Sequence, residues 1–115
     1  MEKIIFNKDR TITNIVATLL RESVDNNASL IETVKNNDSF NVSYMINGVV
    51  ETFAVIPLEM YKNVVSHVKM LASLNSDKKD RQDGDFKMKI HDKDTKFDVT
   101  ILLVDEFEKI IIKLS

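Results

Sequence analysis

Two segments of the chain repeat apolar residues at the spacing of an α-helix. The first begins after Asp9 or Thr11, either of which can cap a helix, and ends at Asp25-Asn26-Asn27. The second follows Pro57, which suits a first helical turn, and ends near Asn75. Each segment therefore predicts an amphipathic helix, with one apolar stripe that packs against the core. The stripes are Ile12, Ile15, Val16, Leu19, Leu20 and Val24, and then Leu58, Tyr61, Val64, Val65, Val68, Leu71 and Ala72.

A β-hairpin is predicted between these helices, around Asn47-Gly48. This dipeptide is a strong hairpin signal, because both loop residues must adopt positive φ. The pairs that follow share a mostly apolar face, which we assign to the core: Ile46 with Val49, Tyr44 with Glu51, Val42 with Phe53, and Phe40 with Val55. The opposite face carries Asn41, Ser43, Met45, Val50, Thr52 and Ala54. A weaker strand at 29–35 precedes the hairpin, and residues 4–6 form an optional leading strand.

Three further strands are predicted after the second helix. A polar segment from Ser76 to Gly84 comes first, and we expect it to be exposed, with Gly84 in a left-handed conformation. Turns are expected at Asp92-Lys93-Asp94 and at Asp105-Glu106. The alternating apolar residues of the three strands are Phe86, Met88 and Ile90, then Phe97, Val99, Ile101 and Leu103, and finally Ile110, Ile112 and Leu114.

The predicted order is a helix, three strands, a helix and three strands, with an optional strand in front. Strands joined by short turns are antiparallel neighbours. Two amphipathic helices can cover one face of such a sheet. The sequence therefore predicts a two-layer α+β fold, with an antiparallel sheet of about six strands, in a single domain over residues 1–115.

Composition excludes several classes of function. The net charge is −2 and the lysines are dispersed, so we expect no nucleic-acid partner. The chain has no cysteine and two separated histidines, whereas a metal site needs three or four converging ligands, so no metal or cofactor is expected. No apolar run approaches the length of a membrane span and no signal peptide is present, which predicts a cytoplasmic protein without membrane insertion.

The residues from Val64 to Lys113 carry a family resemblance. They read V-V-S-H-V-K-M-L-A-S-L, then R-Q-D-G-D-F, then a strand pair, then F-E-K-I-I-I-K-L. This segment resembles the domain that precedes the motor domain in type II secretion and type IV pilus assembly ATPases, where the pattern is I-K-x-L-A-x-L, P-Q-D-G-R-F, L-R-V-S and G-E-K-x-V-x-R. The resemblance implies a PAS-like fold with the same order of helices and strands.

The chain departs from this family pattern mostly at polar positions. Leu30 and Glu32 replace the Asp and His of A-S-D-I-H, and Ser43 and Met45 replace two arginines of the hairpin. Asp85 and Asp98 stand where the pattern has two more arginines, while Glu108, Lys109 and Lys113 keep the family's charges. The resemblance implies that such arginines face nucleotide phosphate on the motor domain. The chain also lacks the G-x-x-x-x-G-K-[ST] loop of a nucleotide motor.

These observations favour a protein that is not an enzyme. The resemblance implies a non-catalytic interaction module, which binds a component of a secretion or pilus machine, or a second copy of itself. The residues expected to bind a partner are Met45, an apolar residue on the outer face, and Arg81, Gln82 and Asp83 in the exposed segment. Two alternatives stay open: a PAS-like domain that senses a small ligand between sheet and helices, and the N-terminal fragment of a longer secretion ATPase.

Overall fold

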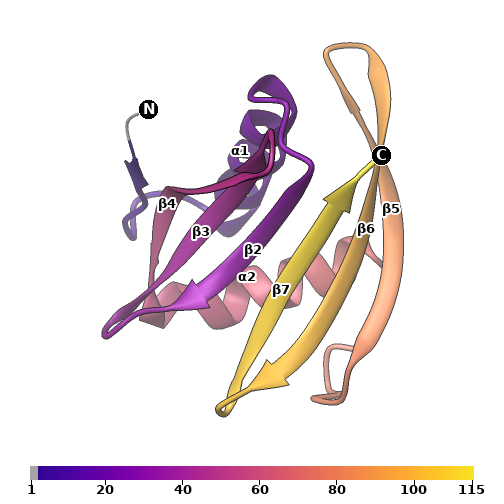
Figure 1. Ribbon diagram of the computed structural model, residues 1–115. Helices are drawn as coiled ribbons and strands as arrows, with labels where there is room; N and C mark the ends of the chain where they lie inside the picture. Colours follow the sequence, from indigo (N-terminus) through magenta and orange to yellow (C-terminus); the bar gives the residue numbers. More distant parts are fainter. Residues whose placement is uncertain (1–2) are drawn as a thin grey trace.

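The computed structural model describes residues 3–115 and contains two helices and seven strands (Figure 1). The predicted order is confirmed, including the leading strand. The helices are α1 (Ile12–Asp25) and α2 (Leu58–Leu71). The strands are β1 (Ile4–Ile5), β2 (Leu30–Lys35), β3 (Ser39–Ile46), β4 (Val49–Pro57), β5 (Gln82–Ile90), β6 (Lys93–Val104) and β7 (Phe107–Leu114).

The strands form one sheet in the order β1-β4-β3-β2-β7-β6-β5. Two antiparallel groups, β4-β3-β2 and β7-β6-β5, meet where β2 pairs with β7. The leading strand β1 is parallel to β4, so the sheet is mixed rather than wholly antiparallel. The α+β class predicted from the sequence is confirmed.

Both helices pack on one face of this sheet and leave the other face uncovered (Figure 1). Thr11 caps α1, because its hydroxyl accepts a hydrogen bond from the Asn14 amide at 3.1 Å. The helix stripes meet alternate residues of the strands in one apolar core, which includes Ile31, Phe97 and Ile112. No helix in the described part of the chain is long and apolar enough to cross a membrane.

The β3–β4 hairpin contains a β-bulge that the sequence pattern does not reveal. The predicted register holds from Ile46–Val49 to Tyr44–Glu51, and Ser43 then pairs with Thr52. Beyond the bulge Val42 pairs with Ala54 and Phe40 with Ile56, so the predicted pairs Val42–Phe53 and Phe40–Val55 are wrong by one residue. The extra residue lets Phe53 and Ala54, adjacent in sequence, both enter the core. Ala54 therefore does not lie on the outer face.

Gly84 does not form the predicted left-handed turn, because it lies within strand β5. A Cβ atom at this position would come within 2.8 Å of the Ala72 carbonyl oxygen, at the end of α2. The glycine therefore allows the strand to pass close to the helix end. Helix α2 ends at Leu71 rather than near Asn75, and Ser73 follows with φ of 57°.

The turn between β5 and β6 is also displaced from its predicted position. It consists of His91 and Asp92, with φ of 52° and 63°, so Lys93 and Asp94 belong to β6. Two positive φ values are typical of a type I′ hairpin turn. The predicted turn at Asp105-Glu106 is confirmed, with φ of 48° and 73°.

Candidate functional site

The helix-free side of the sheet, called the open face below, gathers six positions at which this chain departs from the secretion-ATPase pattern: Leu30, Glu32, Ser43, Met45, Asp85 and Asp98. Strand register places Met45 opposite Leu30, and Leu30 opposite Lys113. Lys113 lies opposite Asp98, and Asp98 opposite Asp85. These residues form one continuous row across the sheet, called the Met45–Asp85 row.

A second row runs beside the first on the open face. It joins Ser43, Glu32, Ile111, Thr100 and Asp83 through successive strand pairs. Ser43 and Glu32 are two more of the departing positions. Their sequence neighbours on the strands, such as Tyr44 and Ile31, point to the opposite face and are buried under the helices.

The open face divides into an apolar half and a charged half. Val50, Met45 and Leu30 lie together on β4, β3 and β2. On β6 and β5, Asp98 and Asp85 share one cation, because the Lys96 ammonium lies 3.6 Å and 3.9 Å from their carboxylates. The face thus combines apolar contact area on one side with charges of both signs on the other.

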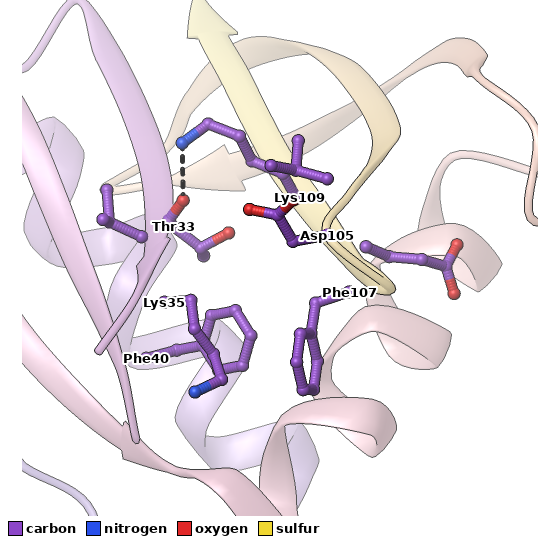
Figure 2. A pocket seen from close by; sticks show the side chains of 9 residues that line it. Thr33, Lys35, Phe40, Asp105, Phe107 and Lys109 are labelled. Carbon is purple, nitrogen blue, oxygen red and sulfur yellow. Dashed lines mark hydrogen bonds between the residues drawn. The ribbon is translucent and has the colours of Figure 1, made fainter. Parts of the chain in front are cut away.

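A cleft opens where β2 and β7 separate. These strands pair only from Leu30–Lys113 to Glu32–Ile111 and then diverge. The opening has a volume of about 430 Å³. Figure 2 shows Phe40 and Phe107 facing each other across it, with rings in edge-to-face contact at 5.5 Å. Its lining is Thr33, Val34, Lys35, Phe40, Val104, Asp105, Phe107, Glu108 and Lys109.

A chain of hydrogen bonds links the diverging strands below the cleft. The Ile110 amide donates to the Thr33 hydroxyl at 3.0 Å, and the Tyr61 hydroxyl donates to the Glu108 carbonyl at 2.5 Å. Since the Tyr61 proton is used, Thr33 must donate in the 2.7 Å bond between the two hydroxyls. Burial raises the pKa of the Tyr61 phenol far above its usual range, which keeps this proton in place.

Lys109 of β7 also joins the two strands, through contacts to Thr33 and Glu32 of β2. Its ammonium donates to the Thr33 carbonyl at 2.8 Å and lies 3.4 Å from the Glu32 carboxylate (Figure 2). Its charge is therefore engaged within the chain. Lys113, which keeps a positive charge where the family pattern has its final arginine, is exposed in the Met45–Asp85 row.

The structure reveals a buried ion pair that the sequence analysis did not single out. Lys69 of α2 is 1% exposed, and its ammonium lies 2.5 Å from the Glu108 carboxylate and donates to the Lys78 carbonyl at 2.8 Å. Lys79 lies 3.2 Å from the same carboxylate. One signal could have found this pair, because Lys69 and Glu108 match charged positions of the I-K-x-L-A and G-E-K motifs.

The four predicted partner-binding residues do not form one cluster. Met45 is half-buried on β3, whereas Gln82 and Asp83 belong to β5 at the far edge of the sheet. Gln82 binds its own chain: its side chain accepts from the Asn75 amide and donates to the Asn75 carbonyl, both at 2.9 Å. Arg81 and Asp83 form an exposed ion pair at 3.2 Å.

Asp83 also accepts a hydrogen bond from the Thr100 hydroxyl at 2.6 Å. This bond first, and then the Arg81 guanidinium, hold the pKa of the Asp83 carboxyl below its ordinary value. Asp83 on the edge strand β5 and Met45 on the inner strand β3 both lie on the open face, while Gln82 has a structural partner in Asn75.

The geometry defines the class of protein as an α+β domain with two helices on one face of a mixed seven-stranded sheet. The model of a family described as type II/IV secretion system protein matches residues 6–115. The chain therefore belongs to this secretion-system family. No curated protein matches the sequence.

Proposed function

We propose that this chain is a non-catalytic interaction module of a secretion or pilus machine, and that a protein partner binds its open face. One observation carries the proposal. The positions where related ATPases have phosphate-facing arginines fall in two adjacent rows of this face, and they hold Ser43, Met45, Asp85 and Asp98.

The charge on these positions argues against phosphate as the ligand. Arginine binds phosphate through its fork of N–H donors, and none of the four replacements offers such a fork. Asp85 and Asp98 repel an anion. Lys96 lies between them and is already paired with both, which leaves Lys113 as the one positively charged member of the row.

The same replacements suit a protein surface. Met45 adapts its shape to an apolar partner, and Val50 and Leu30 extend the apolar contact to either side. The charged half of the face supplies the polar rim that fixes the orientation of a partner.

Site-specific photo-crosslinking in the source cell tests this proposal. A photoreactive phenylalanine analogue at position 45 is expected to capture a component of a secretion or pilus machine. The matched control carries the same analogue at Asn63, which is exposed on α2 on the other side of the molecule. Met45→Asp, with an unchanged melting temperature, should abolish co-purification of the captured component.

Equal capture from positions 45 and 63 would contradict the proposal. Capture from position 45 of proteins unrelated to any such machine would contradict it as well.

The cleft between β2 and β7 supports a second candidate function, the binding of a small molecule. Its volume of about 430 Å³ lies in the range of small-molecule sites. The cavity between sheet and helices is only about 20 Å³, so the cleft is the better place for a ligand. Native mass spectrometry of the freshly purified protein should show a retained ligand mass, lost in Phe107→Ala, if the cleft is occupied.

A further inference from the structure

Strand β5 leaves one whole edge unpaired. It is the last strand of the sheet, runs for nine residues and, among residues 3–115, pairs only with β6 (Figure 1). It contains no proline. An unpaired strand edge of this length offers a row of backbone donors and acceptors to another strand, and the charges along it decide which strand can pair there.

The hairpin turn determines which residues of β5 direct their backbone groups outward. A two-residue turn at His91-Asp92 makes Ile90 and Lys93 a hydrogen-bonded pair, and such pairs alternate along an antiparallel ladder. Ile90, Met88, Phe86 and Gly84 therefore bond to β6. Asp83, Asp85, Lys87 and Lys89 direct their N–H and C=O groups to the free edge. No other described segment bonds to these backbone groups.

The charges on these four residues are ordered so that the strand complements itself. In an antiparallel pair of two β5 strands centred on Phe86, Asp85 lies opposite Lys87 and Asp83 opposite Lys89. A shift by two residues in either direction places Asp85 or Lys87 opposite itself, and an in-register parallel pair places every charge opposite its own kind. Opposite charges stabilise cross-strand pairs and like charges destabilise them, so one register is favoured.

The contacts within the chain point the same way. Strand β6 places Lys96 opposite Lys87, so Lys87 faces a like charge on its inner side, and it places Asp98 opposite Asp85, so these two carboxylates share the single Lys96 ammonium. A second β5 supplies the opposite charge on the outer side. On the helix side of the sheet, half-buried Phe86 stacks on Phe97 at 5.2 Å, and Met88 of one copy would lie opposite Gly84 of the other.

We propose that the chain forms a symmetric dimer in which β5 pairs antiparallel with β5 of a second copy, with the two-fold axis at Phe86. The two sheets join into one, and each residue contact occurs twice, as in other isologous interfaces. This dimer uses the strand edge and leaves the open face accessible, so it goes beyond the proposed partner binding.

Charge-reversal variants studied by sedimentation velocity at low salt test the dimer. The wild-type chain is expected to sediment as a dimer. Asp85→Lys and Lys87→Asp should each weaken the dimer about tenfold or more, because both symmetry-related pairs become repulsive. An equimolar mixture of the two variants should form a heterodimer, since every pair across the dyad is then of opposite charge.

Two controls separate pairing from folding. The double variant Asp85→Lys/Lys87→Asp restores opposite charges and should dimerise like the wild type. Asp9→Lys makes the same change of charge beyond β1, at the other edge of the sheet, and should leave the dimer intact. A monomeric wild type, single variants that dimerise as well as the wild type, or a mixture that stays monomeric would each overturn the proposal.

Discussion

At the scale of single residues, Gly84 fixes how closely β5 approaches the end of α2. Besides the Ala72 carbonyl oxygen, an added Cβ would lie 2.8 Å from Cδ2 of Leu74. Real Cβ atoms do not approach a backbone oxygen so closely, so the strand or the helix end would have to move. The glycine of the Q-D-G motif thus has a packing role in an extended strand.

Gly84→Val should lower the free energy of unfolding by about 1–3 kcal/mol or more, because it overpacks this contact. Thr52→Val, on an exposed strand position, serves as the control and should change stability little. Urea unfolding measures both variants. A Gly84→Val chain as stable as the wild type would show that β5 and α2 are not in close contact.

Lys69 and Glu108 form a second residue-scale feature, a buried ion pair between α2 and β7. Removing one partner of a buried pair leaves the other charge uncompensated, at a cost of about 3–5 kcal/mol. In Glu108→Leu the Lys69 ammonium, which is almost wholly buried, loses its carboxylate partner. In Lys69→Met the Glu108 carboxylate still forms an ion pair with Lys79.

We therefore expect Glu108→Leu to destabilise the chain more than Lys69→Met does. The double variant should be more stable than the sum of the two single losses predicts, as measured in a double-mutant cycle by urea unfolding. Additive losses would show that the two side chains do not interact.

At the scale of elements, the β3–β4 hairpin shows what local sequence can and cannot predict. Asn47-Gly48 fixes the turn and the nearest pairs, because its backbone requirement is local. The bulge is different: nothing in the alternation around Phe53 reveals an extra residue. Its cause is the core, where Phe53 stacks on Tyr44 at 4.4 Å while Ala54 is also buried.

Substitutions along β4 test the bulge. Phe53→Ala should cost about 3–5 kcal/mol, and Ala54→Asp should also destabilise strongly, because it buries a charge. Thr52→Ala should cost much less, since Thr52 is exposed. Thermal and urea unfolding would contradict the bulge if Ala54→Asp were as mild as Thr52→Ala, because regular alternation places Ala54 on the outer face.

At the scale of the whole molecule, the pairing of β2 with β7 joins the two halves of the sheet. The helices, the hairpins and their order could be predicted from short-range periodicity and turn residues. The β2–β7 contact could not, because Leu30 and Lys113 are far apart in sequence and no turn connects their strands. The cleft lies where the β2–β7 pairing ends, so its position could not be predicted from the sequence either.

The same pairing creates the candidate site. Motif comparison identifies Met45, Asp85 and Asp98 as altered positions, but only the register of the assembled sheet shows that they form one row with Leu30 and Lys113. The spacing along each strand shows which residues share a face, but not which residue of a neighbouring strand lies beside them. The row is therefore recognised only from the pairing of all the strands.

The central proposal is that the two rows of the open face do not bind nucleotide phosphate. The three arginines of the chain are Arg10, Arg21 and Arg81, and none lies among the altered positions of the two rows. Of the two β7 lysines that keep a positive charge of the family pattern, Lys109 is engaged by the Thr33 carbonyl, which leaves Lys113 beside Asp98. A single ammonium next to a carboxylate is a weak site for a triphosphate.

Isothermal titration calorimetry with ATP and magnesium tests this claim most directly. We predict no binding heat for the wild-type chain, and none for Lys113→Ala. A clear binding isotherm for the wild type that disappears in Lys113→Ala would contradict the account and establish the Met45–Asp85 row as a nucleotide site.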